Sequence, residues 1–147
     1  MTTIHAGALA LGEHGVLIRG APGTGKSDLA RGLLARWSLA GRYSALVADD
    51  RTVLRVANGH LIARPAPELA GLAEVRSAGI FRGPFLDAVV LSLVVELMPA
   101  PPRIPEPTDH KVDLAGVCLN RVALEERMTG RNVEALWWVM NAARVDG

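Results

Sequence analysis

The feature that most constrains the fold of this chain is the segment GAPGTGKS at residues 20–27, which directly follows the expected strand Val16–Arg19. It fits the pattern G-x-x-x-x-G-K-[ST], in which glycines let the backbone curl until successive N–H groups face one anion. In such a loop Lys26 places a positive charge at the outer phosphates, and the Ser27 hydroxyl can bind magnesium. This mechanism requires a strand before the loop and a helix after it, and the sequence indicates both. We therefore predict a nucleotide- or phosphate-binding loop in an α/β fold.

The remaining sequence indicates further strands, one clear hairpin and a second helix. The Asn58-Gly59 pair favours a type I′ turn between two strands, and the apolar run Ala88–Leu97 is typical of a strand covered on both faces. A proline-rich stretch, Pro99–Pro107, is expected to form a loop. The order indicates one α/β domain over residues 1–147. The expected strands are Ile4–Leu11, Val16–Arg19, Ala45–Ala48, the hairpin Thr52–Arg64, Ala88–Leu97 and Val117–Leu124, and the expected helices are Lys26–Trp37 and Asn132–Arg144.

The composition narrows the partners and the compartment. A net charge of +1, with both signs spread along the chain, gives no electrostatic footprint for nucleic acid or an anionic membrane. The most apolar window, Ala88–Met98, is shorter than the ~20 residues that a membrane helix needs, and it contains Glu96. The N-terminus does not read as an export signal, and Cys118 is the sole cysteine. We expect a cytoplasmic protein that contacts neither nucleic acid nor membrane.

Two adjacent acids, Asp49 and Asp50, are the carboxylates expected to work with the loop. The strand that follows the first helix should return parallel to the strand before the loop, which places its carboxyl end beside the phosphates. Neighbouring carboxylates at a strand end point to different sides, so one can face a metal and the other an acceptor. The alternative is a solvated Asp-Asp turn that opens the hairpin. Glu96 is a second candidate metal acid or a solvated strand end, and Asp28 lies near the phosphates or complements the helix dipole.

The order of these motifs resembles the C-terminal catalytic domain of the bifunctional HPr kinase/phosphorylases. That family combines an early strand with a histidine, a P-loop followed by an acid, a strand ending in A-D-D, and a signature E-[IV]-R-x-x-G-I. The corresponding elements here are His5, Gly20–Asp28, Ala48–Asp50 and Glu74–Ile80, and the resemblance covers Ile4–Met98. Longer members carry an N-terminal regulatory domain. The chain resembles the short form of alphaproteobacteria, in which no such domain is expected.

The resemblance implies a P-loop fold of the phosphoenolpyruvate carboxykinase type, with a mixed sheet and flanking helices. It also implies ATP-dependent phosphorylation of a serine in HPr, the small phosphocarrier protein of the sugar phosphotransferase system. The reverse activity would use inorganic phosphate to remove the group as pyrophosphate. The implied substrates and cofactors are therefore ATP, magnesium, phosphate and pyrophosphate, and the implied partner is HPr.

The family's site residues carry over to matching positions of this chain. Either Asp49 or Asp50 would be the general base toward the serine and the general acid in reverse, with Asp50 favoured at the metal. The other implied roles are magnesium binding for Ser27 and Glu74, positive charge near the transferred group for Arg76, and a place at the edge of the site for His5. The implied nucleotide-binding residues are Gly20, Ala21, Pro22, Gly23, Thr24, Gly25, Lys26, Ser27, Asp28 and Arg131, the last from Gly130-Arg131-Asn132, which echoes a G-R-N motif.

Two other functions stay open at this point. A small-molecule P-loop kinase usually has an acceptor pocket and an arginine-bearing lid, and the lid candidate here is Pro99–Pro107 with Arg103. A nucleotide-binding regulatory module would bind nucleotide without turnover. A closed acceptor pocket would indicate the small-molecule kinase, whereas an open face beside Asp49 would indicate the HPr kinase. Trp137 and Trp138 have the potential to be exposed, and we expect a homo-oligomer.

Overall fold

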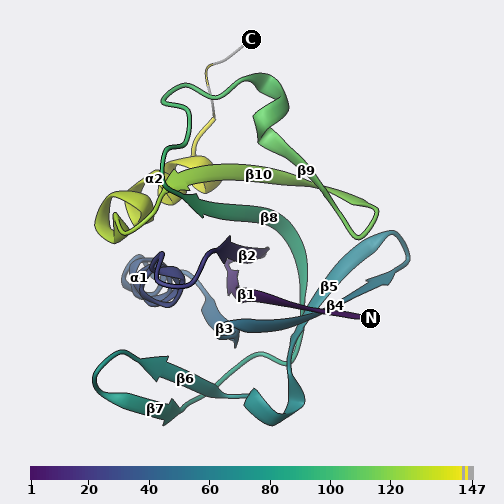
Figure 1. Cartoon of the computed structure of the whole chain (residues 1–147), viewed down its shortest axis with the longest axis vertical. Coiled ribbons are helices and arrows are strands. Elements are labelled where there is room, and N and C mark those ends of the chain that lie inside the picture. The colour runs from purple at the N-terminus through teal and green to yellow at the C-terminus, as the bar shows by residue number, and fades with distance from the viewer. Residues whose placement is uncertain (144, 146–147) are drawn as a thin grey trace.

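The structure is a computed structural model, and it describes residues 1–143 and 145 (Figure 1). Helices α1 and α2 lie together at one side of a strongly bent arrangement of strands. The elements are β1 (Thr2–Leu11), β2 (His14–Gly20), α1 (Lys26–Leu39), β3 (Ser44–Ala48), β4 (Arg51–Ala57), β5 (His60–Pro65), η1 (Pro67–Leu69), β6 (Leu72–Val75), β7 (Gly79–Arg82), β8 (Val89–Met98), η2 (Pro107–His110), β9 (Lys111–Leu114), β10 (Val117–Glu125) and α2 (Thr129–Asn141).

The larger part of the main sheet is mixed, and the glycine-rich loop follows the carboxyl end of its strand β2. Its order is β3-β1-β2-β8-β10-β9, in which β2, β8 and β10 run parallel to one another and the other neighbours are antiparallel. Because β1 is antiparallel to both β2 and β3, those two strands point the same way. The carboxyl ends of β2 and β3 therefore meet at the same edge, as the sequence predicted, although β1 lies between them.

The strands β1 and β8 continue into a second, antiparallel sheet. The first half of β1 pairs with β4, β4 pairs with β5, and the beginning of β8 pairs with β5. Each of these two long strands is thus shared by both sheets. The hairpin β6–β7 forms a separate two-stranded sheet, and in Figure 1 it lies below the rest of the fold.

Two apolar cores lie on opposite faces of the mixed sheet. One contains Leu33 and Trp37 of α1, Leu136 of α2 and the inner faces of the strands beneath them, and the other fills the space between the mixed sheet and the β4–β5 sheet. Leu93 and Val94 of β8 belong to different cores, which confirms that this strand is covered on both faces. This double coverage explains why the strand is apolar throughout its length.

Most predicted elements are present with shifted ends. The first strand is longer than predicted, the second helix begins three residues before Asn132 and ends at Asn141, and Arg144 lies outside the described residues. The Asn58-Gly59 turn of the hairpin has positive φ at both residues, 52° and 76°, as a type I′ turn requires. The short strands β6, β7 and β9 were not predicted. The structure confirms a mixed α/β fold with a large mixed sheet.

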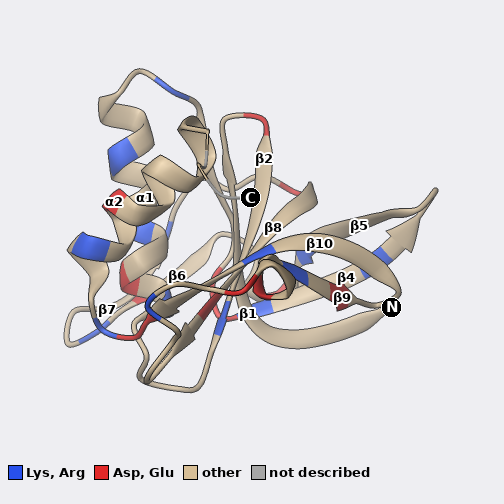
Figure 2. Cartoon of the chain, turned by 90° about the horizontal axis from the view of Figure 1, so that it is seen from above, with Lys and Arg blue, Asp and Glu red and all other residues tan. Residues whose placement is uncertain are grey.

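Charges of both signs alternate over the fold rather than gathering on one face (Figure 2). No helix within residues 1–143 is long and apolar enough to cross a membrane. Of the two neighbouring tryptophans, Trp137 packs edge-on against Trp37 with ring centroids 4.9 Å apart, whereas Trp138 is 68% exposed. Trp138 is therefore the one of the pair that is available for self-association.

Gly15 allows β2 and β8 to approach closely. A Cβ atom at this position would lie 2.2 Å from the carbonyl oxygen of Val90, which is a backbone atom that cannot move aside cheaply. We expect Gly15→Ala to lower the free energy of unfolding by about 3 kcal/mol in urea denaturation. The matched control is Gly130→Ala in α2, where a Cβ atom meets nothing within 4 Å and helix propensity should add up to ~1 kcal/mol. Equal stabilities of the two variants would contradict the close approach.

Candidate active site

The glycine-rich loop is held in shape by its own backbone and by one buried threonine. Gly23 and Gly25 have φ values of 79° and 94°, a region that favours glycine. Thr24 is 2% exposed, and its hydroxyl donates a hydrogen bond of 2.8 Å to the carbonyl of Ala21. A Cβ atom at Gly20 would lie 2.7 Å from this hydroxyl oxygen, so the cradle leaves no room for a side chain there. The residues present fit the bound anion that the motif predicts.

Lys26 lies folded back over the loop at the start of α1. Its Nζ donates to the carbonyl oxygens of Gly20 and Ala21, at 2.9 and 3.2 Å. The ammonium group is therefore held at the centre of the loop by acceptors that belong to the loop itself. Phosphate oxygens that enter the cradle would replace these weak neutral acceptors with charged ones.

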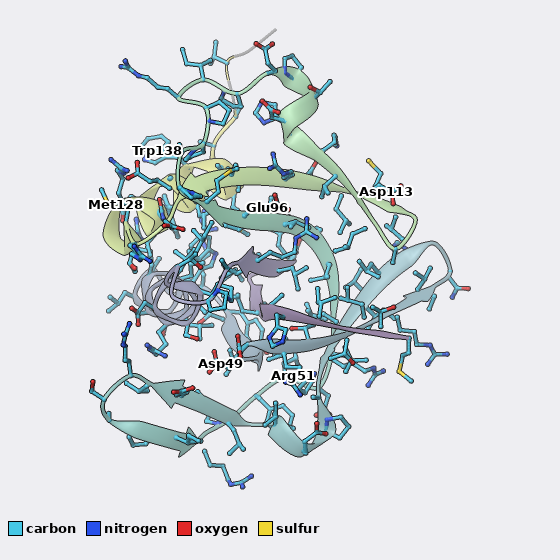
Figure 3. The ribbon with its side chains drawn as sticks, in the orientation of Figure 1. Asp49, Arg51, Glu96, Asp113, Met128 and Trp138 are labelled. Atoms are coloured by element: carbon cyan, nitrogen blue, oxygen red, sulfur yellow. The ribbon has the colours of Figure 1, made fainter. Side chains whose placement is uncertain are left out.

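A hydrogen bond joins the loop to the end of β3. The Ser27 hydroxyl donates to Oδ1 of Asp49 at 2.8 Å, and Oδ2 of the same carboxylate accepts the backbone N–H of Glu74 at 2.9 Å. Figure 3 shows Asp49 on the side of the main sheet that faces the β6–β7 hairpin. Asp49 therefore connects three segments of the chain: the loop, the strand end and the hairpin.

The backbone turns sharply at Asp50, the second acid. Its φ is 69°, and the Arg51 N–H donates to the carbonyl of Asp49 at 2.8 Å across it, which defines a γ-turn of the rare positive-φ kind. Such a backbone conformation is strained for a non-glycine residue and often occurs at functional sites. The Asp50 side chain is exposed and lines the same cavity as the loop. Among the described residues, no hydrogen bond or ion pair involves its carboxylate.

The β6 strand is fixed against α1 by its backbone. Besides the Asp49 contact at the Glu74 N–H, the Glu74 carbonyl accepts a hydrogen bond of 3.2 Å from Arg31, and Arg31 pairs with Asp28 at 2.6 Å. Asp28 is thus bound to an arginine in the first turns of α1. The ion pair with Arg31 and the positive end of the helix dipole both stabilise the negative charge of Asp28.

Arg127 is a site residue that the sequence analysis missed. It lies in the turn between β10 and α2, where its backbone N–H donates to the Thr24 carbonyl at 3.0 Å and its Nε donates to the Gly23 carbonyl at 2.9 Å. The signal was available, because ligands bind at the carboxyl ends of the parallel strands in open α/β sheets and a strand was predicted over Val117–Leu124. The charged residues just beyond that strand, Arg127 among them, were therefore candidates.

These groups surround one open cavity of about 460 Å³. Most of the predicted site residues lie around it, and Thr129 and Arg31 lie there as well. The complete lining is Pro22, Gly23, Gly25, Lys26, Ser27, Asp28, Arg31, Asp49, Asp50, Glu74, Arg76, Arg127 and Thr129. The structure therefore brings the loop, the acid pair and the signature segment together.

Other predicted residues lie outside this lining. Gly20, Ala21 and Thr24 form the inner framework of the loop. His5 is exposed on β1. Its partner on β4 is Arg51, the residue that follows Asp50. Arg131 is in the first turn of α2 and pairs with Glu125 at 3.1 Å.

Asn132, next to Arg131, is 3% exposed and donates to the Glu125 carbonyl at 2.7 Å. The G-R-N segment thus anchors the turn between β10 and α2. The proline-rich segment Pro99–Pro107, the candidate lid, contributes no residue to the lining of the cavity.

A second cavity, of about 310 Å³, lies away from the loop. It has no glycine-rich segment and no acid among its lining residues, so it lacks the features of a phosphate-transfer site. Its lining is His14, Ser92, Leu93, His110, Asn120, Arg121, Val139 and Met140.

Glu96, the second candidate acid, is paired with two arginines instead of facing the loop. Its carboxylate accepts hydrogen bonds from Arg19 and from Arg121, the latter at 2.8 Å. Burial alone would raise the pKa of Glu96, but the hydrogen bonds and charges of Arg121 and Arg19 outweigh it, so the pKa lies below its ordinary value of 4.5. Figure 3 shows Glu96 beside β8, farther from the hairpin than Asp49.

This ion pair gives a pH-dependent contribution to stability. Because the pKa of Glu96 is lowered by folding, the contribution is present above pH 4.5 and is lost as the pH falls through the folded-state pKa. We expect Glu96→Gln to cost roughly 1–3 kcal/mol of unfolding free energy at pH 7, and the difference from the unaltered chain to shrink below pH 4.5. Urea denaturation at both pH values measures this.

The control is Glu134→Gln, which breaks the exposed pair of Glu134 with Arg36 and should cost at most ~0.5 kcal/mol. A pH-independent difference for Glu96→Gln would contradict the assignment.

The described residues include no group of three or more His, Cys, Asp or Glu side chains that could hold a metal ion by themselves. Magnesium typically binds one or two protein carboxylates together with substrate phosphates. The hydroxyl of Ser27 and the carboxylate of Asp49, in contact beside the loop, fit such a shared site.

The mixed sheet, the loop at the end of β2 and the acid pair at the end of β3 define an α/β protein with a P-loop site. The family model of the HPr serine kinase C-terminal domain matches residues 1–84. The chain belongs to this family.

Comparisons of this chain with one known sequence and one solved structure agree with this family assignment. The chain is 36% identical over 77 residues to an HPr kinase/phosphorylase of Mycoplasma mycoides, which covers 52% of this chain and 23% of that protein. It thus spans about a quarter of the length of this relative. Its structure is similar to that of the Hpr(Ser) kinase/phosphatase from Coxiella burnetii, with a TM-score of 0.74, 27% identity, and coverage of 96% of this chain and 95% of the other.

Proposed function

We propose that this chain is an ATP-dependent kinase of the phosphoenolpyruvate carboxykinase-type P-loop fold that phosphorylates a serine of HPr. The observation that carries the proposal is the Ser27–Asp49 hydrogen bond, because it joins the phosphate-binding loop to an acid pair at the end of a neighbouring strand. A kinase needs an acid beside the metal and a base toward the acceptor hydroxyl, and this junction supplies two carboxylates with different contacts, one bonded and one free of bonds to the described residues.

The contacts favour Asp49 at the metal and Asp50 as the general base. The resemblance favoured the reverse, with Asp50 at the metal. Both oxygens of Asp49 are engaged, one by Ser27 and one by the Glu74 N–H, which suits a group that orders the metal side of the site. Asp50 faces the same cavity without such bonds and suits the general base. Magnesium, when bound, would offset the negative charge of the outer phosphates, and Ser27, Asp49 and Glu74 are the residues that would hold it.

The transfer step then follows from the arrangement of the side chains. Lys26 moves from the carbonyls of Gly20 and Ala21 to the phosphate oxygens of ATP. Asp50 accepts the proton of the serine hydroxyl as its oxygen bonds to the γ-phosphorus, while the bond from phosphorus to the ADP oxygen breaks. Arg76 and Arg127, which line the same cavity, place positive charge near the transferred group.

The same residues support the reverse reaction in the proposal. A cradle that holds the outer oxygens of a triphosphate also accommodates inorganic phosphate. An oxygen of that phosphate bonds to the phosphorus of the phosphoserine and forms pyrophosphate, while the bond from this phosphorus to the serine oxygen breaks. Protonated Asp50 returns its proton to the departing serine oxygen.

The openness of the site favours a protein acceptor over a small molecule. Asp50, Glu74 and Arg76 are all exposed, and none of the residues Pro99–Pro107, including Arg103, lines the cavity as a lid would. Self-association through the exposed Trp138 and a cytoplasmic location complete the proposal.

The direct test is incubation of the full chain with purified HPr, ATP and magnesium, followed by mass-spectrometric location of the phosphate. We expect phosphoserine. Phosphorylation of a histidine, or nucleotide binding without transfer, would contradict the proposal, and the second outcome would identify a regulatory module.

A further inference from the structure

The hairpin β6–β7 has two faces, and one of them continues the catalytic cavity. Side chains along a strand alternate between faces, and residues directly opposite each other in an antiparallel pair share a face. Glu74 and Arg76 line the cavity, whereas Val75 between them does not. The face that carries Glu74 is therefore the one turned toward the site.

The strand register places Ile80 on this face. Ile80 is the partner of Glu74, and Phe81 is the partner of Ala73 on the opposite face. The Glu74 N–H and carbonyl are bonded to Asp49 and Arg31, outside the hairpin. Glu74 and Ile80 therefore form a non-hydrogen-bonded pair, in which side chains lie closest together.

Ile80 is also much more exposed than an apolar side chain with a packing role. Its side chain is 70% exposed, and every residue of β7 is exposed. The hairpin is held to the rest of the fold through β6, so the apolar group at Ile80 stabilises nothing that the structure shows. It lies beside the cavity lining, because its strand partner Glu74 lines the cavity and Ile80 does not.

We propose that Ile80 determines acceptor specificity by binding an apolar side chain adjacent to the serine that is phosphorylated. The occupant is the acceptor segment of the protein substrate, and the argument for it is the continuity of this face with the catalytic cavity through Glu74 and Arg76. This inference rests on the proposed function. A small acceptor bound within the cavity would have no contact with Ile80.

The test is steady-state phosphorylation of purified HPr by the full chain and by two variants, with nucleotide affinity measured in parallel. Ile80→Ser should raise KM for HPr and lower kcat/KM about tenfold, since burial of an isoleucine side chain is worth that much or more. Nucleotide affinity should stay unchanged, and Ile80→Val should restore most of the loss. The matched control is Phe81→Ser, which removes a 52% exposed apolar side chain from the other face and should change kcat/KM less than twofold.

The outcomes separate this inference from the proposed function. No phosphoserine with the unaltered chain contradicts the proposed function itself. An active unaltered chain whose KM for HPr is unaffected by Ile80→Ser, or is raised equally by Phe81→Ser, overturns the role of Ile80. Weaker nucleotide binding by Ile80→Ser would likewise overturn it, because the residue would then act through the structure of the site.

Discussion

Replacing Asp50 by asparagine is expected to slow phosphoryl transfer to HPr by ~10²-fold or more, because general-base catalysis typically contributes 10² to 10⁴. Asparagine keeps the size of the side chain and tolerates the positive φ of 69° at this position, so the fold should be unaffected. Nucleotide affinity should be retained. Initial rates with HPr, ATP and magnesium, together with a nucleotide titration, measure both quantities.

The comparison with Asp49→Asn tests how the two acids divide their roles. Loss of the Asp49 charge beside Ser27 should raise the magnesium concentration that half-maximal activity requires, whereas Asp50→Asn should leave that concentration unchanged. Full activity of Asp50→Asn would refute its assignment as the base. A magnesium dependence altered only by Asp50→Asn would support the reverse division.

Lys26→Ala should weaken nucleotide binding by roughly 10- to 100-fold, because the variant loses charge-assisted hydrogen bonds to the phosphates. Isothermal titration with a non-hydrolysable ATP analogue measures the change. Arg131→Ala is the control, because Arg131 pairs with Glu125 and lies outside the cavity lining, and its affinity should stay within twofold. If Arg131→Ala weakens binding as strongly as Lys26→Ala, the nucleotide extends toward α2.

The parts of the fold that could be predicted are those with strong local signals. The glycine-rich loop, the Asn58-Gly59 hairpin and the doubly covered strand β8 each have a short-range physical cause that is visible in the sequence. The return of β3 parallel to β2 followed from general connection rules. These signals brought Ser27, Asp49 and Glu74 to one cavity, whereas their chemical roles stay predictions.

The rest depended on pairings between distant segments. The insertion of β1 between β2 and β3 is a choice among sheet orders that no local pattern specifies. The strands β6 and β7 are short, and β7 has no buried residue, so they lack the apolar alternation that identifies a strand. Glu96 was a plausible metal acid until the parallel register placed it opposite Arg19, where it forms an ion pair.

The sharing of β1 and β8 by two sheets affects how the molecule opens. Neither strand leaves one sheet without disrupting the other, so their amide protons should exchange with solvent only through cooperative unfolding of the whole unit. The β6–β7 hairpin shares no strand with either of these sheets, so its amides should exchange through local opening. Mutations in β7 therefore carry little thermodynamic penalty for the core, so the segment that carries Ile80 is free to diverge together with the proposed acceptor protein.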